Sequence, residues 1–252
     1  MIPPNQLEIS IIYKDEDLCL VDKPPGLFVH SNPLAPSAPN CVSILSRRFD
    51  SRVYNVHRID RPTSGLVLLA LSREAAAKLS TQIREGAMVK RYLALVRGHL
   101  NQRVEIDHPV PKSKHGERVD ARSTVRPIST SVLKRPVGKF DEGWFSLVEV
   151  TIETGRFHQA RRHLRSIGHH VIGDSSHGDP AQNRFFRDEF GDSRMFLRAQ
   201  YLAFTHPATD DSMSVAAGLP AWWRKMLISV AITLPESIPT EPVVSPGNRD
   251  DR

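Results

Sequence analysis

Residues 56–71 read VHRIDRPTSGLVLLAL, and this stretch sets both the fold and the chemistry that we expect of the chain. Its last six residues are apolar, which is typical of a central strand buried on both faces. A turn precedes this strand, because a proline and a glycine stand in the run RPTSG. The turn carries Asp60 between Arg58 and Arg61. An acid placed in this way is either a partner in a structural ion pair or a catalytic carboxylate.

A second segment, residues 88–98, reads MVKRYLALVRG and predicts a strand over residues 90–96. Its charged and aromatic residues stand at the start of the strand. Among them are Lys90 and Tyr92. A tyrosine in a strand is most often a packing residue, so this segment gains meaning only together with the others.

A third segment, residues 153–164, reads ETGRFHQARRHL. An apolar face that repeats at about 100° per residue predicts a helix over residues 156–167. On this helix Arg161 lies at the border of the apolar face, whereas Arg162 points away from it. We therefore expect Arg161 to reach a buried carboxylate, and Arg162 to stay with solvent or phosphate.

These three segments resemble, in the same order, the motifs of the RluA-type pseudouridine synthases, and residues 23–30 (KPPGLFVH) resemble the first segment of that family. The sequence departs from the motifs at Ile59, where leucine is usual, and at Ala160, where leucine or isoleucine is usual. Both departures keep an apolar residue. The resemblance implies an isomerase that converts a uridine of RNA into pseudouridine without a cofactor. It also implies an α+β fold with a mixed, largely antiparallel central sheet, flanking helices and a central RNA-binding cleft.

The resemblance further implies roles for individual residues. Asp60 is expected to be the reacting carboxylate, Tyr92 to lie against the target base, and Arg161 to hold Asp60 ionised through charge-assisted hydrogen bonds. The target base is expected to be flipped out of its helix, with Arg58 filling the gap. The residues expected to contact RNA are His57, Arg58, Arg61, Lys90, Arg156 and Arg162. No cofactor-binding or metal-binding residue is expected.

Within that family, residues 61–65 and the loop at 173–184 are most similar to the branch that modifies uridine 65 in the T-stem of tRNA. Ribosomal RNA is the alternative substrate. We expect residues 1–234 to form a single catalytic domain of two lobes without an appended RNA-binding domain. Residues 235–252 are rich in proline and poor in apolar residues, so we expect a disordered tail.

Composition agrees with an RNA partner. The 252 residues carry a formal net charge of +6, and the tail is acidic, so the body of the protein is more basic than the whole. A basic surface favours a polyanion because each phosphate contact releases counterions. The sequence lacks a long apolar run and does not begin like a signal peptide, so we expect a cytoplasmic protein, and a monomer. Cys19 and Cys41 stand in apolar surroundings and are expected to be buried free thiols.

Local patterns predict the remaining elements. Strands are expected over residues 7–13, 18–23, 145–152 and 195–205, and helices over 42–49 and 221–231. A further helix should follow Ser72 as its N-cap and end at Gly86. Residues 112–136 read as a long loop or irregular hairpin that could face RNA, and residues 168–184 as a loop.

Three rival functions each fit part of the sequence. A metal-dependent phosphohydrolase would use ligand-type residues close in sequence, but the i, i+4 helical pair typical of such sites is missing. These residues are His169, His170, Asp174, His177 and Asp179. A kinase would require a GxGxxG loop, which the sequence lacks. A non-catalytic RNA-binding function would account for the basic charge but not for the presence of the three motifs.

Overall fold

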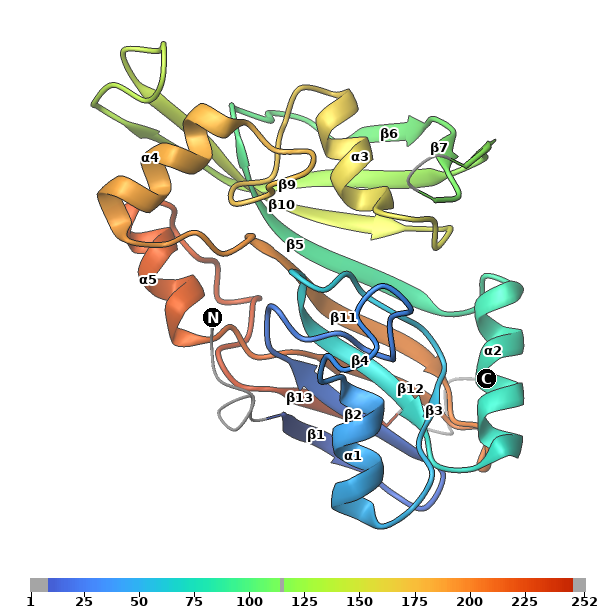
Figure 1. Ribbon diagram of the computed structural model, residues 1–252. Coiled ribbons are helices and arrows are strands. Elements are labelled where there is room, and N and C mark those ends of the chain that lie inside the picture. The colour runs from blue at the N-terminus through green and yellow to red at the C-terminus, as the bar shows by residue number, and fades with distance from the viewer. Residues whose placement is uncertain (1–8, 114–115, 247–252) are drawn as a thin grey trace. The chain divides into compact units, whose positions relative to one another are not determined.

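The computed structural model describes residues 9–113 and 116–246 (Figure 1). In chain order its elements are β1 (Ser10–Lys14), β2 (Leu18–Lys23), α1 (Cys41–Phe49), β3 (Tyr54–Asn55), β4 (Ser64–Ala70), α2 (Arg73–Arg84), β5 (Val89–Arg97), β6 (Val104–Asp107), β7 (Val110–Pro111), β8 (Arg118–Val119), β9 (Arg122–Leu133), β10 (Gly143–Ile152), α3 (Gln159–Ser166), α4 (Pro180–Phe190), β11 (Leu197–Thr205), β12 (Ser212–Ala216), α5 (Ala221–Ser229) and β13 (Val243–Pro246). The chain divides into two compact units. The first unit contains β1 to β4, α1, α2, β12, β13 and most of β11. The second unit contains β6 to β10, α3 to α5 and nearly all of β5.

In the first unit the strand order is β1-β2-β4-β11, with β12 and β13 following β11 and β3 also pairing with β4. The strand pairs β1–β2, β2–β4 and β11–β12 are antiparallel. Every residue of β4 is buried, as the apolar run predicts. Leu45 of α1 and Leu79 of α2 are fully buried, so both helices contribute to the core of this unit.

Both helices of the first unit begin at residues that cap them. The Asn40 side chain accepts a hydrogen bond from the backbone N–H of Ser43 (2.9 Å). The Ser72 hydroxyl accepts one from the backbone N–H of Ala75 (3.0 Å), which confirms the predicted N-cap. Cys19 and Cys41 are buried free thiols, also as predicted.

In the second unit the strand order is β5-β10-β9-β6, and all three pairs are antiparallel. For residues 112–136 the sequence predicts a long loop or an irregular hairpin. The loop alternative is wrong, because β9 occupies most of the segment, and β8 at its start pairs antiparallel with β7. The sequence does not reveal β9 because some of its buried residues are polar: Ser123 and Ser131 are buried where apolar side chains would be expected. Pro127 is tolerated because the pairing of β9 with β10 shifts beside it, at a β-bulge.

The core of the second unit is aromatic and lies where α4 and α5 cover β5 and β10. The Phe145 ring meets the Phe186 ring edge-on (5.3 Å between centroids), and the Trp223 ring meets that of Phe196 in the same way (5.1 Å). The prediction of a loop through residues 182–184 is wrong, since they belong to α4. Asp179 caps this helix at the N–H of Ala181 (2.9 Å) and Pro180 occupies its first turn.

Two further predicted boundaries change. The helix expected over 156–167 begins at Gln159, because His158 has a left-handed backbone conformation (φ 54°) that ends the preceding turn. The expectation that residues 235–252 are disordered fails at Val243–Pro246, where β-branched valines pair with β12 as β13. The antiparallel sheets and flanking helices confirm the predicted α+β class. No helix within residues 9–113 and 116–246 has the length and apolarity that a membrane crossing requires.

Gly65, at the start of β4, tests the packing of the first unit. Its φ is +107°, and a Cβ there would lie 2.2 Å from the carbonyl oxygen of Ala199 on β11. Gly65→Ala adds backbone strain and a clash with main chain that cannot move aside. We expect it to lower the free energy of unfolding by roughly 2–4 kcal/mol, measured by urea denaturation. Gly86→Ala, also at positive φ but with open space around its Cβ, is the control and should cost less. Equal losses of unfolding free energy in the two variants would show that the contact between residue 65 and Ala199 is not tight.

Candidate functional site

The turn that carries Asp60 is held by hydrogen bonds within the first unit. The Asp60 carbonyl accepts from the Thr63 N–H (3.1 Å), which closes the turn ahead of β4. The Arg61 carbonyl accepts from the Gly26 N–H (2.8 Å) and from the Lys23 ammonium (3.1 Å). The Arg61 side chain returns a bond from Nε to the Gly26 carbonyl (3.0 Å). Asp60 is thus presented by a turn that is tied to residues 23–26.

Lys23 is a functional candidate that sequence reasoning did not select. It is fully buried, and its Nζ also donates to the carbonyls of Pro24 and Leu27 (2.8 Å each). Burial lowers its pKa to about 7, although the neighbouring Cys41 and Asp60 side chains act in the opposite direction. Its carbonyl partners show that Lys23 organises the segment behind Asp60. The signal in the sequence was a lysine that ends a strand whose first four residues are apolar.

The neighbours of Asp60 in the motif have structural contacts of their own. His57 accepts a hydrogen bond at Nε2 from the N–H of Leu68 (3.0 Å), so it braces the middle of β4. The guanidinium of Arg61 lies over the Phe28 ring, 5.1 Å from its centroid. Arg58 is exposed. Within the described residues His57 and Arg61 make the structural contacts given above, and the RNA-binding roles of His57, Arg58 and Arg61 stay predictions.

In the second unit the central feature is a buried ion pair between Arg161 on α3 and Asp174 in the following loop. Arg161 donates from Nε to Oδ2 (2.8 Å) and from a terminal nitrogen to Oδ1 (2.6 Å). The two side chains are only 3% and 1% exposed. Oδ1 of Asp174 also accepts from the N–H groups of Ser176 (2.8 Å) and His177 (3.0 Å).

These contacts decide the charge of Asp174. Burial by itself would raise the pKa of this carboxyl, but the bonds from Arg161 and the two backbone amides outweigh it and hold the pKa below its usual value. Sequence reasoning placed Asp174 only in the rival metal set. The prediction that Arg161 is the inward arginine of its helix is confirmed by its burial, while its expected partner Asp60 belongs to the other unit and that pairing stays a prediction.

Two histidines lie beside this pair. Nδ1 of His158 and Nε2 of His177 are 2.9 Å apart, and the Phe157 ring stacks on that of His158 with 3.8 Å between centroids. Burial, with Arg161 adding to it, lowers the pKa of His177 to about 4, so this ring is neutral at pH 7. The guanidinium of Arg162 lies over the other aromatic ring of the group, 5.7 Å from the centroid of Phe157.

The remaining predicted residues of the second unit lie on β5 and ahead of α3. Lys90 and Tyr92 are two residues apart, so they share one face of β5, and both are buried. Burial lowers the pKa of Lys90. Arg156 donates from Nε to the Asp120 carbonyl (3.1 Å), and its own N–H donates to the side-chain oxygen of Gln159 (3.0 Å).

The residues of the rival metal site are engaged elsewhere. Asp174 is paired with Arg161, and Asp179 caps α4 and pairs with Arg97. His169 contacts the Arg97 carbonyl (3.0 Å) and His170 that of His177 (3.0 Å) through their Nδ1 atoms. These contacts do not form a ligand set.

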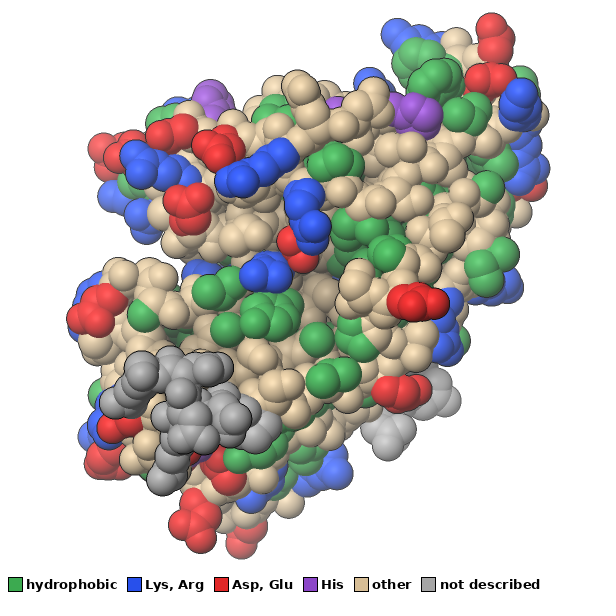
Figure 2. Space-filling view, turned by 180° about the vertical axis from the view of Figure 1, so that it is seen from behind, with side chains coloured by type: hydrophobic (Ala, Val, Ile, Leu, Met, Phe, Trp, Pro, Cys, Tyr) green, Lys and Arg blue, Asp and Glu red, His purple; other side chains and the backbone are tan. Residues whose placement is uncertain are grey.

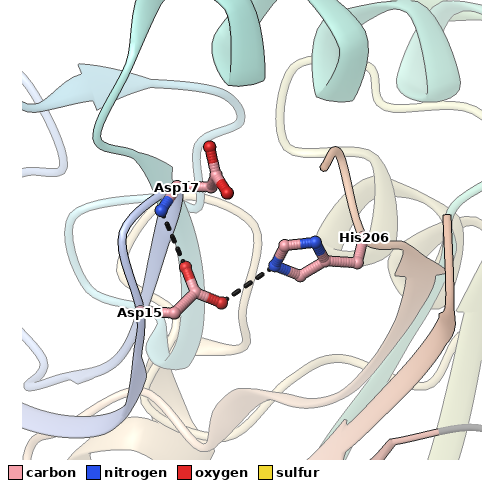
Figure 3. A group of neighbouring side chains, drawn as sticks. All are labelled: Asp15, Asp17 and His206. Carbon is pink, nitrogen blue, oxygen red and sulfur yellow. Dashed lines mark hydrogen bonds and ion pairs between the residues drawn. The ribbon is translucent and has the colours of Figure 1, made fainter. Parts of the chain in front are cut away.

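A different group, Asp15, Asp17 and His206, is close enough to suggest a metal site within the described residues (Figure 3). Asp15 is already saturated, because it accepts from the N–H of Asp17 (2.8 Å), from the N–H of Leu18 (2.9 Å) and from the Tyr13 hydroxyl (2.8 Å), and contacts Nε2 of His206 (2.8 Å). The group therefore joins the β1–β2 turn to the end of β11 as a structural contact.

Asp174→Asn tests the buried pair. The change keeps the shape but removes the carboxylate charge that pairs with the buried Arg161 guanidinium, and breaking a buried ion pair in this way typically costs about 3–5 kcal/mol. We expect a loss of that size in the free energy of unfolding at pH 7. Glu105→Gln removes an exposed partner of Arg103 and should cost less than about 1 kcal/mol. Equal, small losses in the two variants would contradict the account of Asp174.

Comparison with known proteins agrees with this geometry. Residues 17–166 match the family described as RNA pseudouridylate synthase. The chain is 34% identical over 231 residues to tRNA pseudouridine synthase C of Vibrio parahaemolyticus, covering 87% of this chain and 94% of that protein. It is 36% identical over 230 residues to the protein of the same name from Salmonella typhi, covering 87% and 88%.

Solved structures share the fold. Human RNA Pseudouridylate Synthase Domain Containing 1 superposes with a TM-score of 0.69 at 24% identity, covering 87% of each chain. Human RNA Pseudouridylate Synthase Domain Containing 4 gives 0.67 at 21% identity, covering 90% of this chain and 95% of that one. These likenesses and the sequence matches define an α+β enzyme that acts on uridine in RNA. The chain belongs to the RNA pseudouridylate synthase family, and it is an isomerase.

Proposed function

We propose that this enzyme converts uridine 65 in the T-stem of tRNA into pseudouridine and that the carboxylate of Asp60 starts the reaction. The observation that carries the tRNA assignment is the similarity to proteins named tRNA pseudouridine synthase C, which extends over 87% of this chain. The motif residues 61–65 and residues 173–179, with Asn183 and Arg184 of α4, support the same substrate. The net charge of +6 suits a polyanion. We propose that it acts as a monomer in the cytoplasm.

The reaction breaks the bond between N1 of uracil and C1′ of ribose, turns the base, and forms a bond between C5 and C1′. C5 loses its proton and N1 gains one, so the atoms balance without a co-reactant. An ionised carboxylate can begin this by attacking C1′ as a nucleophile or by removing a ribose proton as a base. Asp60 suits either role, since its turn is fixed to Lys23 and Gly26 from behind.

The other residues of the site assist in defined ways. Tyr92 offers a ring against which the freed uracil can stack, and its hydroxyl can take the proton from C5. Arg161 supplies a planar guanidinium whose direction is fixed by Asp174, and we assign it the role of a hydrogen-bond donor to the Asp60 carboxylate. Arg58 is exposed and can enter the space left by the flipped base. His57, Arg61, Lys90, Arg156 and Arg162 contribute to the surface for RNA.

Asp60→Asn tests the assignment of the carboxylate. The amide cannot act as nucleophile or base, so we expect the release of tritium from tRNA labelled at C5 of uridine to fall by at least about 1,000-fold, which is roughly 4 kcal/mol in the activation barrier. Affinity for tRNA should stay within about threefold, because the basic surface is unchanged. Asp22→Asn, which replaces an acid on β2, is the control. Turnover within tenfold of wild type would rule out Asp60 as the reacting group.

Arg161→Lys and Arg162→Lys form a matched pair of variants on adjacent positions of α3. Lysine keeps the charge but loses the planar fork that contacts both oxygens of Asp174. Arg161→Lys should therefore lower kcat by orders of magnitude. Arg162→Lys should chiefly change tRNA affinity and its dependence on salt. If both variants lose kcat alike, Arg161 has no special role in the reaction.

A further inference from the structure

Three arginines of the second unit, Arg118, Arg162 and Arg165, form a group of positive charges beside α3, which we call the arginine cluster. Arg162 and Arg165 stand three residues apart on α3, so their side chains are neighbours on one side of the helix. Arg118 belongs to β8. Arg118 and Arg165 are exposed and Arg162 is half-buried, so the cluster is open to solvent.

Hydrogen bonds hold Arg118 beside α3. A terminal nitrogen of Arg118 donates to the Pro109 carbonyl (2.6 Å) and to Nε2 of His108 (2.9 Å). The His108 carbonyl in turn accepts from Nε2 of His163 on α3 (2.9 Å). Since His163 is fully buried, this contact ties residues 108 and 109 firmly to the helix. The guanidinium of Arg118 is therefore positioned with respect to α3 before any ligand binds.

The charges of the cluster repel one another. Burial lowers the pKa of the Arg162 guanidinium below its usual value, and neighbouring cations lower that pKa further by like-charge repulsion. These neighbours are Arg118, Arg161 and Arg165. Asp174 pairs with Arg161 and so leaves the charges of the cluster without compensation. An anion bound among the three arginines would remove this repulsion.

Other basic side chains of the second unit have acidic partners. Arg122 pairs with Asp107 (3.1 Å), and Arg126 pairs with Glu149 (3.2 Å). Figure 2 shows the same pattern at several places on the face that it presents, where Lys and Arg side chains lie beside Asp and Glu side chains. Within the part of the chain that the structure describes, the three arginines of the cluster form no ion pair. The cluster is thus a concentration of positive charge that lacks its counter-charge.

The chemistry of the cluster fits a phosphate group. A guanidinium presents several N–H donors in one plane and binds phosphate oxygens through charge-assisted hydrogen bonds. The Phe157 ring supports the Arg162 guanidinium, whose carbon lies 5.7 Å from the ring centroid, and this contact limits the movement of the side chain. The enzyme acts on RNA, and the RNA backbone offers a phosphate at every nucleotide.

We propose that Arg118, Arg162 and Arg165 together bind one backbone phosphate of the RNA substrate. The proposal rests on the proposed function only for the identity of that RNA as tRNA. The contact positions the RNA and carries no sequence information, because the phosphate is the same at every nucleotide. β8, which has no part in the proposed reaction, thereby takes part in binding the substrate.

The first test measures tRNA binding and steady-state kinetics of the double variant Arg118→Gln with Arg165→Gln. Its Kd and KM for tRNA should rise about fivefold or more, and the plot of log Kd against log salt should become shallower by about 0.7–0.9, the change expected for one phosphate contact. Its kcat should stay within about twofold, because the contact is equally strong in the ground state and in the transition state.

The matched control is the double variant Arg103→Gln with Arg126→Gln, which removes the same two charges from the same unit. Both of these arginines pair with acids, Glu105 and Glu149. The control should keep the salt dependence of wild type and a Kd within about twofold of it. Equal effects in the two double variants would show that only net charge matters, and would overturn the proposal.

The second test identifies the phosphate by ethylation interference. Ethylation removes the charge of a backbone phosphate, so the positions at which it weakens binding mark the phosphates that the protein contacts. Arg118→Gln and Arg165→Gln, each tested singly, should lose sensitivity at the same position of the tRNA. A pattern identical to that of wild type, or losses at two different positions, would contradict a shared site.

Two further outcomes keep the tests decisive. Both substituted side chains are exposed, and an unchanged urea midpoint confirms the fold of each variant. If Arg118→Gln does not fold, Arg165→Gln decides by the loss or retention of one interfering position. If wild type forms no pseudouridine in tRNA, the proposed function fails. The salt dependence is then measured with an RNA hairpin of unrelated sequence, since phosphate contacts do not depend on sequence, and an unchanged slope in the Arg118 and Arg165 double variant would overturn the phosphate site.

Discussion

Arg161 and Asp174 are almost completely hidden from solvent and meet through a bidentate ion pair. Two charges in such a place stay there only if each has its partner, because either one alone would be strongly destabilising. The pair therefore fixes the rotation of α3 about its axis and the course of the loop that follows. Backbone N–H groups from the loop complete the coordination of Asp174. The guanidinium that we assign to the reaction is thus held in direction before RNA arrives.

The first unit also has a buried charged side chain that supports a loop, and there it is a lysine. The Lys23 ammonium is buried among three backbone carbonyls, one of them in the turn that follows Asp60. Burial lowers its pKa to about 7, so the cost of burying this cation is substantial and the carbonyl contacts offset it. In each unit a buried charge supports a loop that carries a candidate for the reaction.

Much of the fold could be predicted because local signals were unambiguous. The apolar run of β4, the Ser72 cap and the burial of Arg161 all followed from spacing and side-chain type. β9 was missed since buried serines and a proline at a bulge hide its alternation. α4 was missed although Asp179 and Pro180 are a common start of a helix. The partner of Arg161 could not be found from sequence, because it depends on how a loop folds back on a helix.

The proposed substrate is a single uridine in the T-stem of tRNA. Pseudouridine can be mapped at single-nucleotide resolution in all RNA from cells that have the gene, lack it, or have it restored. The account predicts that deletion removes pseudouridine at position 65 of tRNA and leaves ribosomal RNA unchanged, and that restoring the gene returns it. Loss of a pseudouridine in ribosomal RNA, with tRNA unchanged, would contradict the assignment.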